Sequence, residues 1–165
     1  MQADACGQWI ALLALTAGSF LGIVASTAAA NTEEEVDWVV EEEATGTTYT
    51  LEGDNSRLSV ECVSERFGGG AVVSMVVNGF DPVPRSRTNV IIGERIFHVR
   101  HDFVGVGVTD CPECATDFEA LWSTLREPGT DEITLKSAEE RRYLPSRGGE
   151  IALGGCVPDS KRVNP

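Results

Sequence analysis

The strongest chemical signal in the chain is a pair of cysteines, Cys111 and Cys114, separated by two residues. The residues before them predict a strand and the residues after them predict a helix. Amide N–H groups at a helix start and the helix dipole stabilise a thiolate, which lowers the pKa of a thiol there and raises its reactivity. The pair therefore fits either thiol–disulfide exchange or a structural disulfide.

The order strand, Cys-x-x-Cys, helix resembles that of thioredoxin-like oxidoreductases, and Pro145 could mimic their downstream proline. In such an enzyme Cys111 would be the exposed nucleophile and Cys114 the resolving thiol. In this chain, however, the motif lies about two thirds of the way along, after a half that predicts only strands. Too little sequence follows it to complete an α/β sheet, so we expect a structural disulfide and keep exchange as the alternative.

The other cysteines favour disulfides over a metal site. Removal of an export signal would eliminate Cys6 and leave an even set, Cys62, Cys111, Cys114 and Cys156, which is typical of a disulfide framework and allows three pairings. A bond between Cys62 and Cys156 would close a loop of 156 − 62 = 94 residues and contribute on the order of 4 kcal/mol. Zinc is the rival, but one Cys-x-x-Cys pair is weak support for it, so we expect no metal.

Both histidines lie in one short segment that ends at Asp102. On a strand, side-chain alternation puts His98 and His101 on opposite faces, which prevents a shared metal ion. A base needs a nucleophile beside it, and no Gly-x-Ser-x-Gly context accompanies these residues. We therefore assign no catalytic residue and no cofactor, and expect a non-enzymatic protein.

An export signal is predicted at the N-terminus. The stretch Trp9–Ala30 carries no charge and ends in Ala28-Ala29-Ala30, which suits signal peptidase and would leave Asn31 as the first mature residue. No Lys or Arg precedes the apolar core, unlike a typical signal peptide. An uncleaved anchor is the alternative, since the stretch approaches the roughly 20 residues that span a bilayer. We expect residues 1–30 to be removed and residues 31–165 to form one periplasmic or secreted domain.

The chain is strongly acidic, with a formal net charge of −13. Such a charge argues against nucleic acid or anionic lipid as a non-specific partner. Much of it lies in Thr32–Glu43, which we interpret as a partly solvated face or leader. The expected partner is an unidentified protein or envelope component, with membrane contact only through the N-terminal segment if that segment stays uncleaved.

Strand signals dominate the rest of the chain. Leu58, Val60 and Cys62 alternate with polar residues, the period-two pattern of a half-buried strand. Turn residues at Gly53–Ser56 and Phe67–Gly70 separate the early runs, which predicts an antiparallel meander of four strands. The predicted strands are Val36–Glu42, Thr47–Glu52, Arg57–Val63, Ala71–Val77, Val90–Ile92, Arg95–Arg100, Asp102–Val108, Glu132–Lys136, Arg141–Leu144 and Glu150–Leu153.

One helix interrupts this pattern. Thr116 and Glu119 have the form of a capping box, and Phe118, Leu121, Trp122 and Leu125 place apolar side chains on one face. We expect a helix over residues 116–127 that covers a sheet. The predicted fold class is mainly β, an antiparallel sandwich-like domain with one packed helix.

The layout resembles that of small periplasmic proteins of the invasion-associated locus B family. The similarity lies in a Trp-bearing first strand at Trp38, a core Cys62, a late helix with Phe118-x-x-Leu121-Trp122-x-x-Leu125, and a closing Gly149-x-x-Ala152-Leu153-x-x-Cys156. The resemblance implies a non-enzymatic periplasmic β domain tied to the cell envelope or to host interaction. It transfers no binding residues and does not account for the Cys111–Cys114 pair.

Overall fold

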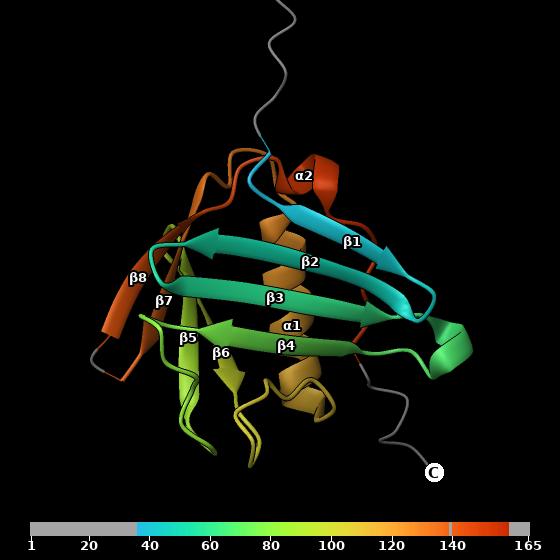
Figure 1. The fold of residues 1–165 in the computed structure, drawn as a ribbon, viewed down its shortest axis with the longest axis horizontal. Helices are drawn as coiled ribbons and strands as arrows, with labels where there is room; N and C mark the ends of the chain where they lie inside the picture. The colour runs from blue at the N-terminus through green and yellow to red at the C-terminus, as the bar shows by residue number, and fades with distance from the viewer. Residues whose placement is uncertain (1–35, 139, 159–165) are drawn as a thin grey trace, which may run out of the picture. The chain divides into compact units, whose positions relative to one another are not determined.

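The computed structural model of the chain describes residues 36–138 and 140–158, so the predicted signal peptide lies outside the described residues. The described residues form two antiparallel four-stranded sheets and one long helix (Figure 1). The predicted fold class, a mainly β sandwich-like domain with one packed helix, is confirmed.

The first sheet is a meander in chain order, as predicted from its turn residues. Its strands are β1 (Val39–Glu43), β2 (Gly46–Gly53), β3 (Ser56–Val63) and β4 (Ala71–Val76), with a short 3-10 turn η1 (Glu65–Phe67) between the last two. In β3 the side chains of Leu58, Val60 and Cys62 are buried and those between them face outward. This alternation gives the sheet one apolar inner face.

The second sheet has the order β6-β5-β7-β8. Its strands are β5 (Arg87–Ile92), β6 (Arg95–Arg100), β7 (Glu132–Ser137) and β8 (Glu140–Pro145). The helix α1 (Pro112–Leu125) lies between β6 and β7 in sequence, and β7 returns to pair with β5 on the side away from β6. The strand β6 is therefore left at the edge of the sheet, where α1 contacts it.

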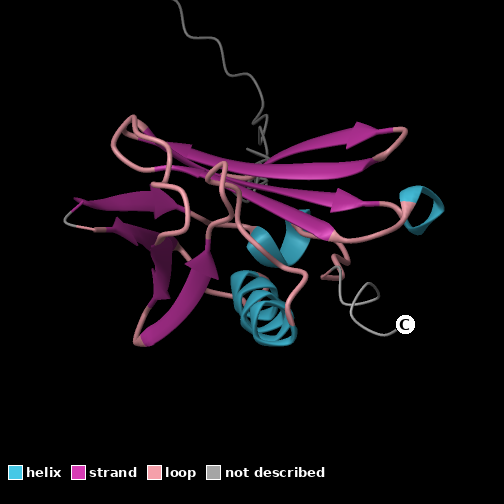
Figure 2. Cartoon of the chain, turned by 90° about the horizontal axis from the view of Figure 1, so that it is seen from below, coloured by secondary structure: helices cyan, strands magenta, loops and turns pink. Residues whose placement is uncertain are grey.

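The second sheet and α1 together cover one face of the first sheet. Figure 2 shows the first sheet as one layer, with the second sheet under one end of it and α1 under the other. Trp122 of α1 packs edge-on against Tyr49 of β2, with ring centroids 5.3 Å apart, and stacks on Phe118 at 5.9 Å. Fully burying one such apolar side chain stabilises a fold by roughly 1.5–3 kcal/mol, so this helix face belongs to the core.

The predicted strand Asp102–Val108 is wrong: this segment forms turns and has only isolated β-bridges in place of a strand ladder. The carboxylate of Asp102 accepts hydrogen bonds from the backbone N–H groups of Val104 and Val106, at 2.8 and 2.9 Å. Gly105 between them has a φ of +90°. Side-chain bonds of this kind compete with a sheet ladder for the backbone donors.

The predicted strand Glu150–Leu153 is also wrong, because its first part is the short helix α2 (Gly149–Ala152). The backbone N–H groups of Ile151 and Ala152 donate to the Gly148 carbonyl, at 3.1 and 2.9 Å. A Cβ at position 149 would lie 2.1 Å from the carbonyl oxygen of Leu125. The turn is thus set by a close approach of backbone to α1 that only glycine permits.

The N-terminal end of the described domain is bound to the segment that follows β8. Asp37 binds Arg147 through side-chain contacts of 2.8 and 2.9 Å, and Trp38 donates its indole N–H to the Ser146 carbonyl at 3.3 Å. The guanidinium of Arg147 holds the pKa of the Asp37 carboxyl below its usual range.

Within residues 36–138 and 140–158, no helix combines the length and apolar character needed to cross a bilayer.

A disulfide joins the first sheet to the C-terminal segment. Cys62 on β3 bonds to Cys156, with their Cα atoms 5.3 Å apart. Next to it, Trp122 donates its indole N–H to the Gly154 carbonyl at 3.0 Å, and the Gly154 N–H donates to the Tyr49 hydroxyl at 3.2 Å. The C-terminal segment is therefore held covalently and by hydrogen bonds against the inner face of the first sheet and α1.

Candidate functional site

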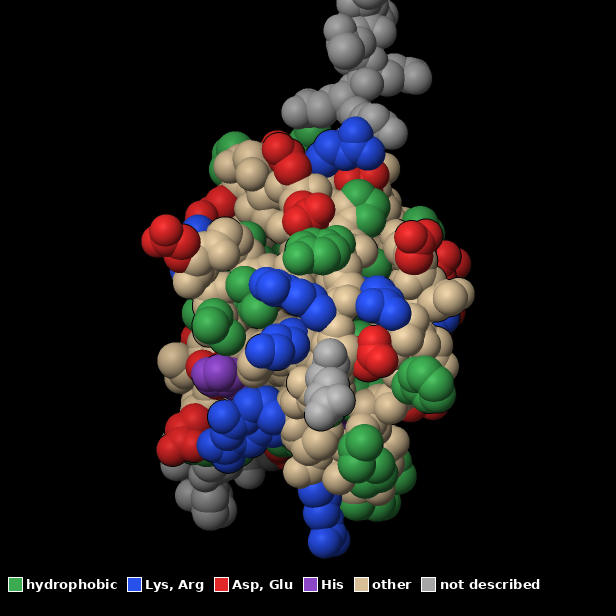
Figure 3. Space-filling view, turned by 90° about the vertical axis from the view of Figure 1, so that its left-hand side faces the viewer, with side chains coloured by type: hydrophobic (Ala, Val, Ile, Leu, Met, Phe, Trp, Pro, Cys, Tyr) green, Lys and Arg blue, Asp and Glu red, His purple; other side chains and the backbone are tan. Residues whose placement is uncertain are grey.

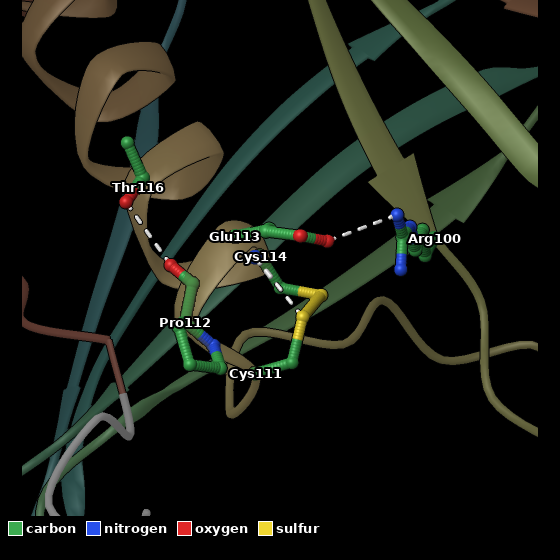
Figure 4. The surroundings of a disulfide bond; sticks show 6 residues. All are labelled: Arg100, Cys111, Pro112, Glu113, Cys114 and Thr116. Carbon is green, nitrogen blue, oxygen red and sulfur yellow. Dashed lines mark hydrogen bonds and ion pairs between the residues drawn. A yellow bond between two sulfur atoms is a disulfide. The ribbon is translucent and has the colours of Figure 1, made fainter.

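The other disulfide, between Cys111 and Cys114, lies at the first turn of α1 (Figure 4). Cys111 is the residue that caps the helix: its Sγ accepts a hydrogen bond from the Cys114 N–H at 3.1 Å, and its carbonyl accepts one from Ala115 N–H at 2.8 Å. The two Cα atoms are 5.0 Å apart. Both sulfurs therefore belong to the helix start.

This geometry corrects the predicted helix boundary. The helix covers Pro112–Leu125 instead of residues 116–127, and Thr116 is not its cap. Pro112 stands at the first helical position, where its fixed φ and missing N–H favour initiation. The Thr116 hydroxyl donates to the Pro112 carbonyl at 3.0 Å instead. The capping-box pattern was thus a coincidence one turn inside the helix.

The two sulfurs differ in accessibility. Cys111 is half-buried, whereas Cys114 is only 6% exposed. A cavity of about 10 Å³ behind Cys114, lined in part by Phe97, Val99 and Phe118, is no larger than one water molecule requires. A reagent can therefore reach this disulfide only from the Cys111 side.

An exposed ion pair lies beside the disulfide. Glu113, between the cysteines, extends toward Arg100 at the end of β6, with 3.3 Å between carboxylate and guanidinium (Figure 4). Both side chains are more than half exposed, so solvent screens the pair. The chief electrostatic influence on a Cys111 thiolate would be the helix N-terminus itself.

The two histidines lie on opposite sides of the second sheet, which confirms the prediction from alternation. His98 is exposed, and its Nδ1 is 2.8 Å from Oδ1 of Asn89. His101 is 4% exposed, and its Nε2 is 2.8 Å from the Thr88 hydroxyl. Burial lowers the pKa of His101, and the backbone of Gly105 and the charge of Asp102 offset this in part. Within the described ranges, no group of three metal-ligating side chains gathers in one place.

A second candidate site is the outer face of the second sheet, which we call the basic face. Figure 3 views the side of the molecule where β7 and β8 lie, and shows Lys and Arg side chains gathered over its middle. We define the basic face by the outward positions of the four strands: Arg87, Asn89 and Ile91 on β5; Ile96, His98 and Arg100 on β6; Glu132, Thr134 and Lys136 on β7; Arg141, Tyr143 and Pro145 on β8. Glu132, paired with Pro145 at one end of β7, is its one acidic member.

Sequence reasoning missed the basic face. Its cations come from four strands that are spread over more than fifty residues, and the net charge of −13 conceals them. A local signal was present in β6 (Arg95–Arg100), where exposed Ile96, His98 and Arg100 alternate with buried Phe97 and Val99. Recognising the cluster required the strand order, because β7 and β8 join β5 and β6 only through tertiary pairing.

Comparison with protein-family models, with curated protein sequences and with solved structures finds no match to this chain.

Proposed function

We propose that the chain is an exported binding or structural module of the cell envelope, non-enzymatic and stabilised by disulfides. The observation that carries the proposal is the bond between Cys62 and Cys156, which joins the inner face of the first sheet to the C-terminal segment. Disulfides of this kind persist in oxidising spaces and are rare where glutathione keeps thiols reduced. A periplasmic or secreted location follows from the same argument.

Two further features support the proposal. The uncharged stretch Trp9–Ala30 has the composition of a signal peptide, and the layout is similar to that of the invasion-associated locus B family. The partner of such a module is a protein or another envelope component, and the acidic net charge argues against nucleic acid as a non-specific partner. The basic face offers a rigid, solvent-exposed surface for that contact.

The experiment that tests this proposal is expression of the full chain in a bacterium, followed by fractionation, thiol alkylation and intact mass measurement. We expect a periplasmic product that starts at Asn31, with no alkylated cysteine. The matched control replaces Ala28 and Ala30 with Leu, which should block cleavage and leave the chain on the membrane. A wild-type chain that remains uncleaved would favour the anchor, and a cytosolic chain with free thiols would overturn the proposal.

A second candidate function is thiol–disulfide exchange, favoured by the half-buried Cys111 at the helix cap and the shielded Cys114. A substrate thiolate would attack Sγ of Cys111 and form a mixed disulfide, releasing Cys114 as a thiolate. A second substrate thiol would then displace Cys111. The substrate is thereby oxidised to a disulfide, and its two electrons and two protons remain on Cys111 and Cys114.

Gentle reduction separates the two functions. If the pair is a redox centre, mild dithiothreitol should open Cys111–Cys114 selectively, and the reduced protein should reduce insulin. The variant Cys114→Ser should then trap a mixed disulfide on Cys111, and Cys111→Ser should trap none. If the bond resists mild dithiothreitol, the exchange function fails; selective opening together with insulin reduction would instead refute the non-enzymatic module.

A further inference from the structure

Two rows of side chains cross the basic face at right angles to its strands. The strand registers align one residue from each strand in each row. The first row contains His98, Asn89, Lys136 and Arg141, and we call it the cationic row after its two charged members, Lys136 and Arg141. The apolar row beside it contains Ile96, Ile91, Thr134 and Tyr143. Arg100 and Arg87 form a further pair on the far side of the cationic row.

The cations of this face are only lightly engaged. Arg100 pairs with Glu113, and Arg141 lies 5.6 Å over the ring of Tyr143. Lys136 and Arg87 are exposed and make no ion pair with any other described residue. By contrast Arg142, on the opposite side of β8, pairs with Glu140 at 3.4 Å. Lys136, Arg141 and Arg87 therefore leave positive charge on the outer face that no described acidic side chain neutralises.

The apolar row is open to solvent at both ends. Ile96 is 55% exposed and Tyr143 is 54% exposed, while Thr134 between Ile91 and Tyr143 is buried. Exposed Tyr, Arg and Ile side chains on a rigid sheet are typical of protein–protein contact surfaces, in which aromatic residues and Arg are enriched. The face therefore combines charge for steering with apolar area for affinity.

The spacing of the two rows matches one kind of partner element. Neighbouring strands lie about 4.8 Å apart, and residues two apart on a strand lie about 6.8 Å apart. An α-helix laid across the strands repeats every 5.4 Å and is 10–12 Å wide. Such a helix would place one residue per turn over each strand of the cationic row, while its neighbouring stripe covers the apolar row.

We propose that the basic face docks an amphipathic helix of a partner protein, one that carries an acidic stripe beside an apolar stripe. This inference rests on the proposed role as a binding module and names the chemistry of its partner. An anionic bilayer fits less well, because it would face a larger part of an acidic molecule, and the formal net charge of −13 over the whole chain opposes such contact. A single helix touches the two rows alone.

The test uses the oxidised full-length chain and two synthetic 18-residue peptides of the same composition. The first places Glu and Leu on adjacent stripes of a helix, and the second scrambles their order. We expect saturable binding of the striped peptide in a fluorescence anisotropy titration. The double variant Lys136→Glu and Arg141→Glu should weaken binding by at least about tenfold, whereas Arg57→Glu, an exposed change on the first sheet, should leave it unchanged.

Reversing the charges of both the peptide and the basic face tests whether binding depends on their electrostatic complementarity. A peptide with Lys in place of Glu should bind the Lys136→Glu and Arg141→Glu variant better than it binds the wild-type chain. Equal binding of the striped and scrambled peptides, no binding of either, or tighter binding to phosphatidylglycerol vesicles than to the striped peptide would each overturn the proposal. None of these results alters where the chain is located, so failure here is distinct from failure of the exported-module function.

Discussion

The two disulfides of this domain use the same bond in opposite ways. Cys62–Cys156 spans 94 residues in sequence and lies at the core, where Cys62 is 9% exposed. Cys111–Cys114 spans three residues and lies in the first turn of α1, with Cys111 half-buried. One ties distant parts of the chain together, and the other constrains a turn that its own helix already holds.

The comparison teaches that sequence separation and position, more than the bond itself, determine what a disulfide does. In the chain-entropy model a long closed loop restricts the unfolded state far more than a short one, giving about 4–5 kcal/mol for the first bridge and about 1.5 for the second. Reactivity depends on access and on thiolate stabilisation. Access is similar for the two bridges, because each joins one buried and one half-buried cysteine, but only Cys111 lies at a helix start that would stabilise a thiolate. We therefore assign stability to Cys62–Cys156 and any chemistry to Cys111–Cys114.

The largest expected effect comes from removing the long bridge. Replacing Cys62 and Cys156 together with Ala should lower the free energy of unfolding by about 4 kcal/mol, because the unfolded chain regains its loop entropy. Equilibrium unfolding in urea measures this difference. A loss no larger than that of the matched double variant at Cys111 and Cys114 would remove the distinction between the two bridges.

Removing the short bridge should lower the free energy of unfolding less, and part of that loss should come from the helix cap that Cys111 provides. Replacing Cys111 and Cys114 together with Ala should cost about 1.5 kcal/mol for the bridge and about 1 kcal/mol more for the lost cap. Placing Ser at position 111 while Cys114 becomes Ala should restore most of the cap contribution. If the Ser and Ala variants unfold at the same urea concentration, then Cys111 does not stabilise the helix start as its geometry indicates.

Acidification should act on the segment between the sheet and the short bridge, where His101 is anchored to Thr88. Burial lowers the pKa of His101, so below the ordinary value of about 6.5 the unfolded state binds a proton that the folded state does not. Stability should therefore fall as the pH drops below about 6.5, by at most about 1.4 kcal/mol per pH unit.

Thermal unfolding between pH 7.5 and 5.5 measures this dependence. His101→Gln should flatten it, whereas His98→Gln on the exposed side should not. The dependence should also persist without the Cys111–Cys114 bond. If it disappears with that bond, the short bridge positions His101 and has a wider structural role than we assign to it.

The smallest expected effect is that of the ion pair beside the short bridge. Because Arg100 and Glu113 are both more than half exposed, replacing both with Ala should change the unfolding free energy by no more than the error of its measurement. The rate at which mild dithiothreitol opens the bridge should change little as well. A clear change in that rate would mean that the pair tunes the disulfide and that position alone does not explain its reactivity.

Much of the fold could be predicted from local patterns. The alternation in β3 and the turn residues around it are signals within a few residues, and they predicted the meander of the first sheet. The predicted strand Asp102–Val108 was wrong because a local side-chain contact competes with strand pairing, and Glu150–Leu153 was wrong because a tertiary contact decides it. Asp102 captures two backbone N–H groups, and Gly149 closes onto the backbone of Leu125.

The two candidate sites also differ in whether local sequence or tertiary pairing brings their residues together. The Cys111–Cys114 pair is visible in sequence because its chemistry lies within four residues, although its place at the cap depended on Pro112. The basic face was invisible because Lys136 and Arg141 become neighbours of His98 only through the order of the second sheet. The net charge of a chain does not show which charged side chains strand pairing brings together on one surface.

The place of Cys156 has a consequence for how the chain matures. Every strand and both helices of the described domain precede this residue, so a ribosome must finish all of them before the partner of Cys62 emerges. Until then no covalent link joins the early meander to the remainder, and the polypeptide can still be threaded through a narrow pore. The Cys62–Cys156 bond can therefore form only after every strand and helix of the described domain has been synthesised.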